Sequence, residues 1–132
     1  MIQPFIDRFI AQEHAMKERL ASLEHPDYAD LFKLTIEAIA WDDDYDDHDS
    51  PDPTRIHEID DGDCQGTLLF VVAARDYQPC NYWYTFISYG SCSGCDVLQD
   101  VLEENEQGSP ERAAQLWTLC LHMVQGMRYM KK

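Results

Sequence analysis

Two apolar runs with one short turn between them set the strongest limit on the fold of this chain. Residues 65–75 (QGTLLFVVAAR) are rich in branched side chains and apolar on both faces, which is typical of a central strand. Residues 76–79 (DYQP) have the composition of a turn, and the aromatic run Asn81–Tyr89 follows as the next strand. A shorter strand at 54–59 precedes both, joined to them through the Asp-Gly turn signal in 60–63. The sequence therefore predicts a three-stranded antiparallel meander over 54–89.

Apolar residues at three- and four-residue intervals predict helices on both sides of this meander. Between residues 2 and 23 the spacing indicates one helix of about twenty residues, which ends at His25-Pro26. A second helix is expected to start with Pro26 as its first residue and to run to about residue 40, so that 1–40 form a helical hairpin.

Two further helices are expected after the meander. One covers 96–104, and the last begins with Ser109 as N-cap and Pro110 at the first helical position. Its predicted buried stripe consists of Ala113, Leu116, Trp117, Cys120, Leu121, Val124 and Met127. The predicted fold class is α+β, with the two C-terminal helices packed on one face of the sheet. At 132 residues the chain is expected to form a single domain, made of the hairpin 1–40, an acidic loop 41–53, the meander 54–89, and 90–132.

The negative charge of the chain is concentrated in one region. The whole sequence has a formal charge of −15, and residues 42–63 hold eleven acids against one base, Arg55. Densely displayed carboxylates can occupy the basic groove of a protein that binds nucleic acid, although charge runs more commonly form a solvated loop. The candidate partner-binding residues are Asp42, Asp43, Asp44, Asp46, Asp47, Asp49, Asp60, Asp61 and Asp63. The same charge argues against direct binding to nucleic acid or to an anionic membrane.

A glycine-rich corner with two cysteines, Tyr89-Gly90-Ser91-Cys92-Ser93-Gly94-Cys95-Asp96, is expected to join the last strand to the next helix. Three interpretations stay open. Unpaired N–H groups at a helix start lower thiol pKa values, so Cys92 and Cys95 would suit a redox pair. They would also suit one half of a zinc site, with Cys80, Cys64 or His57 completing it. Alternatively, the cysteines pack as small apolar residues at a glycine turn. Cys120 is expected in the core.

The corner also carries a resemblance. Gly66-Thr67-Leu68, Tyr82-Trp83 and the run from Tyr89 to Gln99 (YGSCSGCDVLQ) resemble a set of small, uncharacterised phage and bacterial proteins. The resemblance covers about a third of the chain and implies no catalytic role. It implies a phage or mobile-element setting, in which small acidic proteins often block host proteins.

These observations lead to one functional hypothesis and one alternative. The first is a non-enzymatic acidic interaction protein, such as an inhibitor that covers the basic nucleic-acid-binding surface of a host protein, with no cofactor. The alternative is a small zinc or thiol-redox protein built on Cys92 and Cys95. The N-terminal residues lack the basic and apolar regions of a signal peptide, so a cytoplasmic location is expected.

Overall fold

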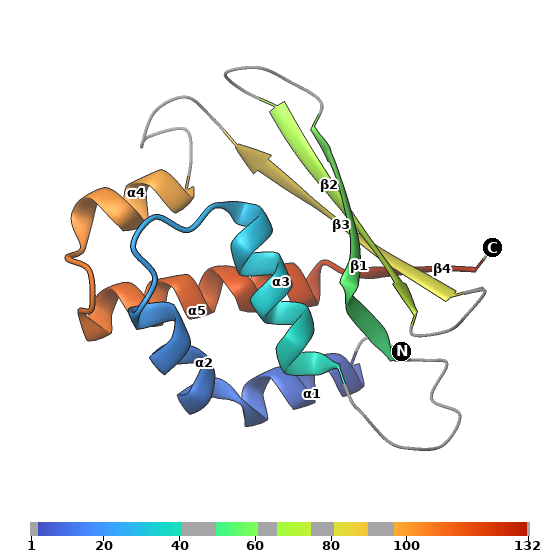
Figure 1. Cartoon of the computed structure of the whole chain (residues 1–132), viewed down its shortest axis with the longest axis horizontal. Coiled ribbons are helices and arrows are strands. Elements are labelled where there is room, and N and C mark those ends of the chain that lie inside the picture. Colours follow the sequence, from blue (N-terminus) through green and yellow to red (C-terminus); the bar gives the residue numbers. More distant parts are fainter. Residues whose placement is uncertain (1–2, 41–49, 61–65, 75–80, 90–96, 132) are drawn as a thin grey trace.

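The computed structural model describes residues 3–40, 50–60, 66–74, 81–89 and 97–131. Within these ranges the chain forms five helices and one four-stranded antiparallel sheet (Figure 1). The helices are α1 (Gln3–Ala11), α2 (Glu13–Ala21), α3 (Tyr28–Ile39), α4 (Val97–Glu104) and α5 (Pro110–Gln125). The strands are β1 (Pro51–Asp60), β2 (Gly66–Ala74), β3 (Asn81–Tyr89) and β4 (Arg128–Lys131). The predicted α+β class is confirmed.

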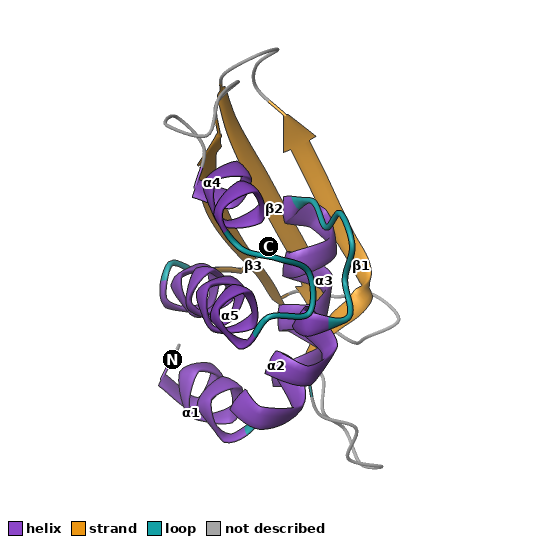
Figure 2. Cartoon of the chain, turned by 90° about the vertical axis from the view of Figure 1, so that its left-hand side faces the viewer, coloured by secondary structure: helices purple, strands orange, loops and turns teal. Residues whose placement is uncertain are grey.

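The sheet has the simple order β1-β2-β3-β4, and each strand pairs antiparallel with the next one in the chain. Figures 1 and 2 together show the helices on one side of it. The register aligns Ile56, Val72 and Trp83 across three strands, with Phe70 two residues before Val72 on the same side. Phe70, Val72 and Trp83 are buried against the helices, so one face of the sheet supplies the core.

Helix α3 lies against the sheet because its apolar residues recur at helical spacing. Its buried residues are Tyr28, Leu31, Phe32, Thr35, Ile36 and Ile39. The helix begins with a capping box: Asp27 accepts a hydrogen bond from the Asp30 backbone N–H, and Asp30 accepts one from the Asp27 N–H, at 2.8 and 3.0 Å. The predicted start at Pro26 is therefore wrong. Pro26 precedes the helix, and Asp27 is its N-cap.

The predicted single N-terminal helix is divided at Gln12, whose backbone leaves the helical region between α1 and α2. The change of direction at Gln12 lets the apolar residues of α1 contact both the sheet and α5. In α1, Phe5 packs edge-on against Trp83 of β3, and Phe9 stacks on Trp117 of α5 at 5.3 Å. Periodicity alone predicts a continuous helix, because it records which residues are apolar and not where the packing surface turns.

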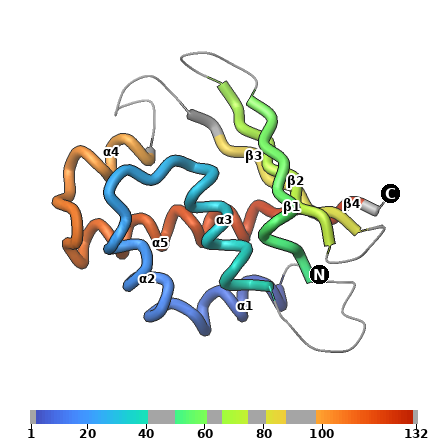
Figure 3. The backbone as a smooth tube through the Cα atoms, viewed as in Figure 1, coloured from blue at the N-terminus to red at the C-terminus, as the bar shows by residue number. Residues whose placement is uncertain are grey.

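The sheet has a fourth strand, β4, which the sequence did not predict. Helix α5 ends at Gln125, and Met127 of its predicted stripe is buried outside the helix, immediately before β4 pairs with β3 (Figure 3). The chain turns at Gly126, where an added Cβ would lie 3.2 Å from the Thr85 Oγ1, so glycine permits a close approach to β3. The first strand also begins earlier than predicted, at Pro51, so the acidic loop does not extend to residue 53.

Candidate acidic groove between α3 and β1

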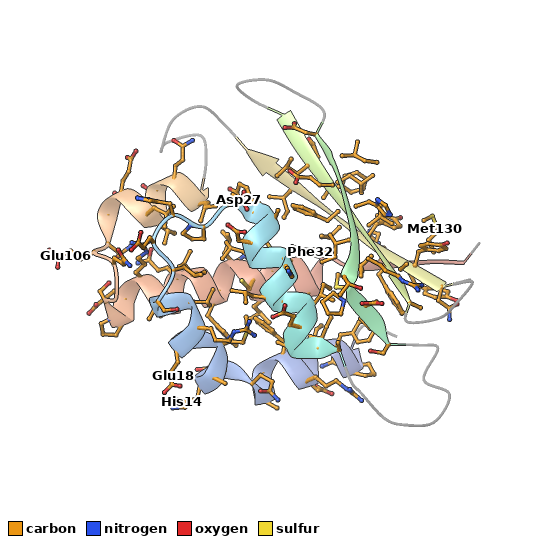
Figure 4. The ribbon with its side chains drawn as sticks, viewed as in Figure 1. His14, Glu18, Asp27, Phe32, Glu106 and Met130 are labelled. Atoms are coloured by element: carbon orange, nitrogen blue, oxygen red, sulfur yellow. The ribbon has the colours of Figure 1, made fainter. Side chains whose placement is uncertain are left out.

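A groove of about 430 Å³ lies between α3 and β1, on the helical side of the sheet. Phe70 of β2, which is fully buried, forms part of its lining, and its polar lining includes Asp30 and Lys33 of α3 and Glu58 of β1. The remaining lining residues are Ala29, Pro53, Thr54 and Ile56. Figure 4 shows Asp27 at the start of α3 and Phe32 between α3 and the sheet.

Four exposed carboxylates form the acidic rim of this groove: Asp27 and Asp30 at the start of α3, and Glu58 and Asp60 near the end of β1. The pKa of Glu58 is raised, first by partial burial and then by the negative charges of Asp27 and Asp60. The two elements therefore bring like charges close enough to disfavour ionisation. A cation placed at this rim would relieve that repulsion.

Other acids of the chain have basic partners. Glu13 accepts from Lys17 at 2.8 Å, Glu37 accepts from Arg19 at 2.7 Å, and Asp52 lies 3.4 Å from Arg55. At Glu58 the two identified electrostatic neighbours are carboxylates instead. Lys33 contributes one positive charge to the groove lining.

Replacement of Glu58 with glutamine tests the repulsion at the rim. Because the folded state binds the Glu58 proton more tightly than the unfolded chain, ionisation of Glu58 lowers stability as pH rises from its ordinary pKa of 4.5 through the raised value. We expect Glu58→Gln to raise the free energy of unfolding at pH 7 by up to about 0.5 kcal/mol, a small gain because these carboxylates are exposed. Urea unfolding at pH 7 and pH 4 should show the gain shrinking toward zero at the lower pH.

The matched control for this measurement is Glu13→Gln, which removes a carboxylate with a favourable partner. It should lower stability slightly at pH 7, the opposite sign, because the Lys17 pair is lost. Equal effects of the two substitutions would show that only the total charge of the chain matters.

Most of the sequence-predicted site residues lie outside the described residues. Asp60 is described, and it stands at the end of β1 within the acidic rim. Asp42, Asp43, Asp44, Asp46, Asp47 and Asp49 fall in 41–49, and Asp61 and Asp63 fall in 61–65. Along the chain, the first of these segments connects α3 to β1 and the second follows β1. Both acidic segments are therefore joined directly to the strand that borders the groove.

Sequence reasoning did not assign Asp27, Asp30 or Glu58 to a site. Asp27 and Asp30 have the spacing of a capping box, a signal that predicts a helix start and not a shared surface with β1. Glu58 lies in the acid-rich region 42–63, but only the fold shows that it faces the same groove as Asp30.

The candidate metal or redox cysteines Cys64, Cys80, Cys92 and Cys95 also fall outside the described residues. His57 is described, is exposed on β1, and pairs with Val71 on the side of the sheet opposite the groove. Among residues 3–40, 50–60, 66–74, 81–89 and 97–131, no three His, Cys, Asp or Glu side chains are grouped as metal ligands would be. The zinc or thiol alternative stays a prediction, and elemental analysis with a free-thiol count before and after chelation tests it.

Cys120 belongs to the core, as predicted. Its side chain is fully buried in α5, and its Sγ lies 3.8 Å from the Leu31 carbonyl oxygen of α3. Burial raises the pKa of this thiol to about 11, and a hydrogen bond with Thr35 only partly opposes the rise. A thiol with that pKa is protonated at neutral pH and is a poor nucleophile.

Comparisons of the chain with protein-family models, with curated proteins and with solved structures found no significant match. None of the helices that the structure describes combines the length and apolar character needed to cross a bilayer.

Proposed function

We propose that this chain is a non-enzymatic interaction protein that binds a protein with a basic surface through the acidic rim and the acidic segments joined to β1. A partner whose basic surface ordinarily binds nucleic acid fits best, because such surfaces present closely spaced Lys and Arg side chains to a dense array of negative charge. Binding there would block the partner from nucleic acid. The phage or mobile-element setting implied by the resemblance agrees with an inhibitor of this kind.

One observation carries the proposal: the fold brings the carboxylates of Asp27, at the start of α3, and Asp60, at the end of β1, near that of Glu58, and after partial burial their charges help to raise its pKa. Along the chain, two more acids, Asp61 and Asp63, follow Asp60 directly, and residues 42–49 and Asp52 place seven acids before and at the start of the same strand. Exposed charges contribute most to association rate and to orientation when they are gathered in one place. The groove next to the rim gives a partner side chain a defined place to enter, which a solvated acidic loop alone would lack.

The experiment measures displacement of a labelled DNA duplex from purified nucleic-acid-binding proteins of the cell that carries the gene. Wild-type chain should displace the duplex from at least one of them at physiological salt. Converting Asp42, Asp43, Asp44, Asp46 and Asp47 to asparagine should weaken this at least tenfold, because five exposed ion pairs at about 0.3 kcal/mol each exceed the 1.4 kcal/mol of one decade. The double variant Glu58→Gln/Asp60→Asn should weaken it about threefold.

The matched control makes the same charge change away from the groove, at Glu18, Glu103, Glu104, Glu106 and Glu111, all exposed and all replaced by glutamine. Figure 4 shows Glu18 and Glu106 at the end of the helical layer away from the sheet. Displacement by this control should stay within about twofold of wild type. Equal losses in the two five-residue variants would mean nonspecific polyanion binding, and failure to displace the duplex from any protein tested would overturn the proposal.

A further inference from the structure

The side of the sheet opposite the helices carries an apolar surface that none of the described helices covers (Figure 2). The register places Val71 opposite Tyr84, Leu69 opposite Phe86, and Tyr82 opposite Met130 on this side. We call it the outer sheet face, and it consists of His57, Ile59, Thr67, Leu69, Val71, Ala73, Tyr82, Tyr84, Phe86, Arg128 and Met130. It draws on all four strands.

Large apolar side chains on this face are exposed to solvent. Phe86 is 61% exposed, Ile59 54% and Met130 43%. Tyr84 and Phe86 contact each other edge to face, with ring centroids 5.8 Å apart, so the aromatic groups form a continuous ridge along β3. Contiguous apolar patches of this kind on a folded domain mark a surface that binds another macromolecule.

The charge of the outer sheet face favours a second copy of this chain over a basic protein as its partner. No position of this face is an acid, although the chain has 25 Asp and Glu residues. Glu58 and Asp60 of β1 alternate to the helical side, and the outward positions nearby are His57 and Ile59. A basic partner would meet Arg128 and His57 here and no acid of this face, so it would gain no charge attraction. Two copies of this acidic chain, by contrast, can approach through this face with the least repulsion.

The size of the face limits the area that a contact between two copies can bury. Three paired strands of about nine residues and a short fourth strand give this face a flat area of roughly 450 Å², to which the uneven surface of the side chains adds. Stable dimers bury about 800 Å² per partner, and weak, transient ones bury about 600 Å² or less. The outer sheet face therefore suits a dimer that dissociates on dilution.

We propose that the outer sheet face is a self-association surface, on which the sheets of two copies pack face to face. Antiparallel sheets pack in this way about 10 Å apart, with apolar side chains of the two faces interdigitated. The acidic rims lie on the helical sides of the two sheets, so the dimer leaves both rims open. The inference does not depend on the function proposed for the rim, and it can fail or succeed separately.

Sedimentation velocity of the full chain in reductant tests the inference, over about 1 to 300 µM, a range that covers weak association. The wild-type mass should rise from 15.3 kDa toward twice that value as concentration increases. Phe86→Glu places a carboxylate in the ridge, and Met130→Glu places one at the β4 edge. Each should raise the dissociation constant at least tenfold, because a buried unpaired carboxylate costs more than 1.4 kcal/mol.

The matched control is Ile10→Glu, the same kind of change at a side chain 49% exposed on α1. It should leave the concentration dependence unchanged. Circular dichroism of each variant at its lowest concentration confirms that it is folded. A wild-type chain that stays at 15.3 kDa throughout would overturn the inference and leave the face to a different kind of partner. Dimerisation of both face variants like wild type, or equal weakening by Ile10→Glu, would overturn it as well.

Discussion

Replacing Phe32 with alanine is expected to lower the free energy of unfolding by about 4 kcal/mol. Phe32 is fully buried in α3 and stacks on the fully buried Phe70 of β2, with ring centroids 4.9 Å apart and planes 12° from parallel. The substitution removes apolar contact from both elements and leaves a cavity at their junction, where neither a helix nor a sheet backbone can easily move in. Since domains of this size are stable by only about 5–15 kcal/mol, the loss would be a large share of the total.

Urea unfolding followed by tryptophan fluorescence measures this loss. The matched control is Phe86→Ala, which removes the same atoms from an exposed position on β3, and it should cost less than about 1 kcal/mol at a concentration that keeps the chain monomeric. A cost below about 1 kcal/mol for Phe32→Ala would contradict the packing of α3 on the sheet. Because Phe70 also lines the acidic groove, Phe32→Ala should weaken rim-dependent binding even where the variant stays folded.

Elements with a strong local signal were predicted closely. The β3 range matches the predicted Asn81–Tyr89, β2 falls one residue inside the prediction at each end, and α5 starts with Ser109 accepting from the Arg112 N–H. Each of these depends on neighbours in sequence: branched residues for a strand, and a serine followed by proline for a helix start.

Elements that depend on distant contacts were not predicted. The four residues of β4 have no strand pattern of their own, and they become a strand because β3 offers an unpaired edge where α5 ends. The break at Gln12 likewise depends on α5 and β3, against which α1 packs through Phe5 and Phe9. Tertiary contacts override local preference in both places.

The candidate site also has residues that the local sequence identified and residues that only the fold brings together. Charge density along the chain identified the region 42–63, which includes Glu58 and Asp60. It could not identify Asp27, which is more than thirty residues from Glu58 in sequence and acts on its pKa only because α3 packs beside β1. The outer sheet face was missed for a related reason. Its aromatic residues alternate along β3 with Trp83 and Thr85, and only the fold shows which alternate set is covered.

Replacing Arg112 is expected to produce the second large loss of stability. Arg112 lies in the first turn of α5, where the helix dipole disfavours a positive charge, and it is only 4% exposed. Its Nη2 donates to the carbonyl oxygens of Leu23 at 3.3 Å and Glu24 at 2.6 Å, just beyond the end of α2. The guanidinium thereby holds the segment between α2 and α3 against α5. The Arg112 Nε is buried and has no hydrogen-bond partner, which reduces the net contribution of this side chain to the free energy of unfolding.

Arg112→Ala should lower the free energy of unfolding by about 3 kcal/mol, because it leaves two carbonyl groups without their donor and opens a cavity. Arg112→Met retains much of the apolar volume and removes the unpaired Nε, so it should cost only about 1–2 kcal/mol. Arg19→Ala is the control, since its exposed pair with Glu37 should be worth less than about 1 kcal/mol. Urea unfolding of the three variants gives the order directly. A methionine variant more stable than wild type would contradict this assignment. It would show that burying the charge destabilises the fold by more than the two hydrogen bonds to carbonyl groups stabilise it, so that packing alone holds α5 against the segment before α3.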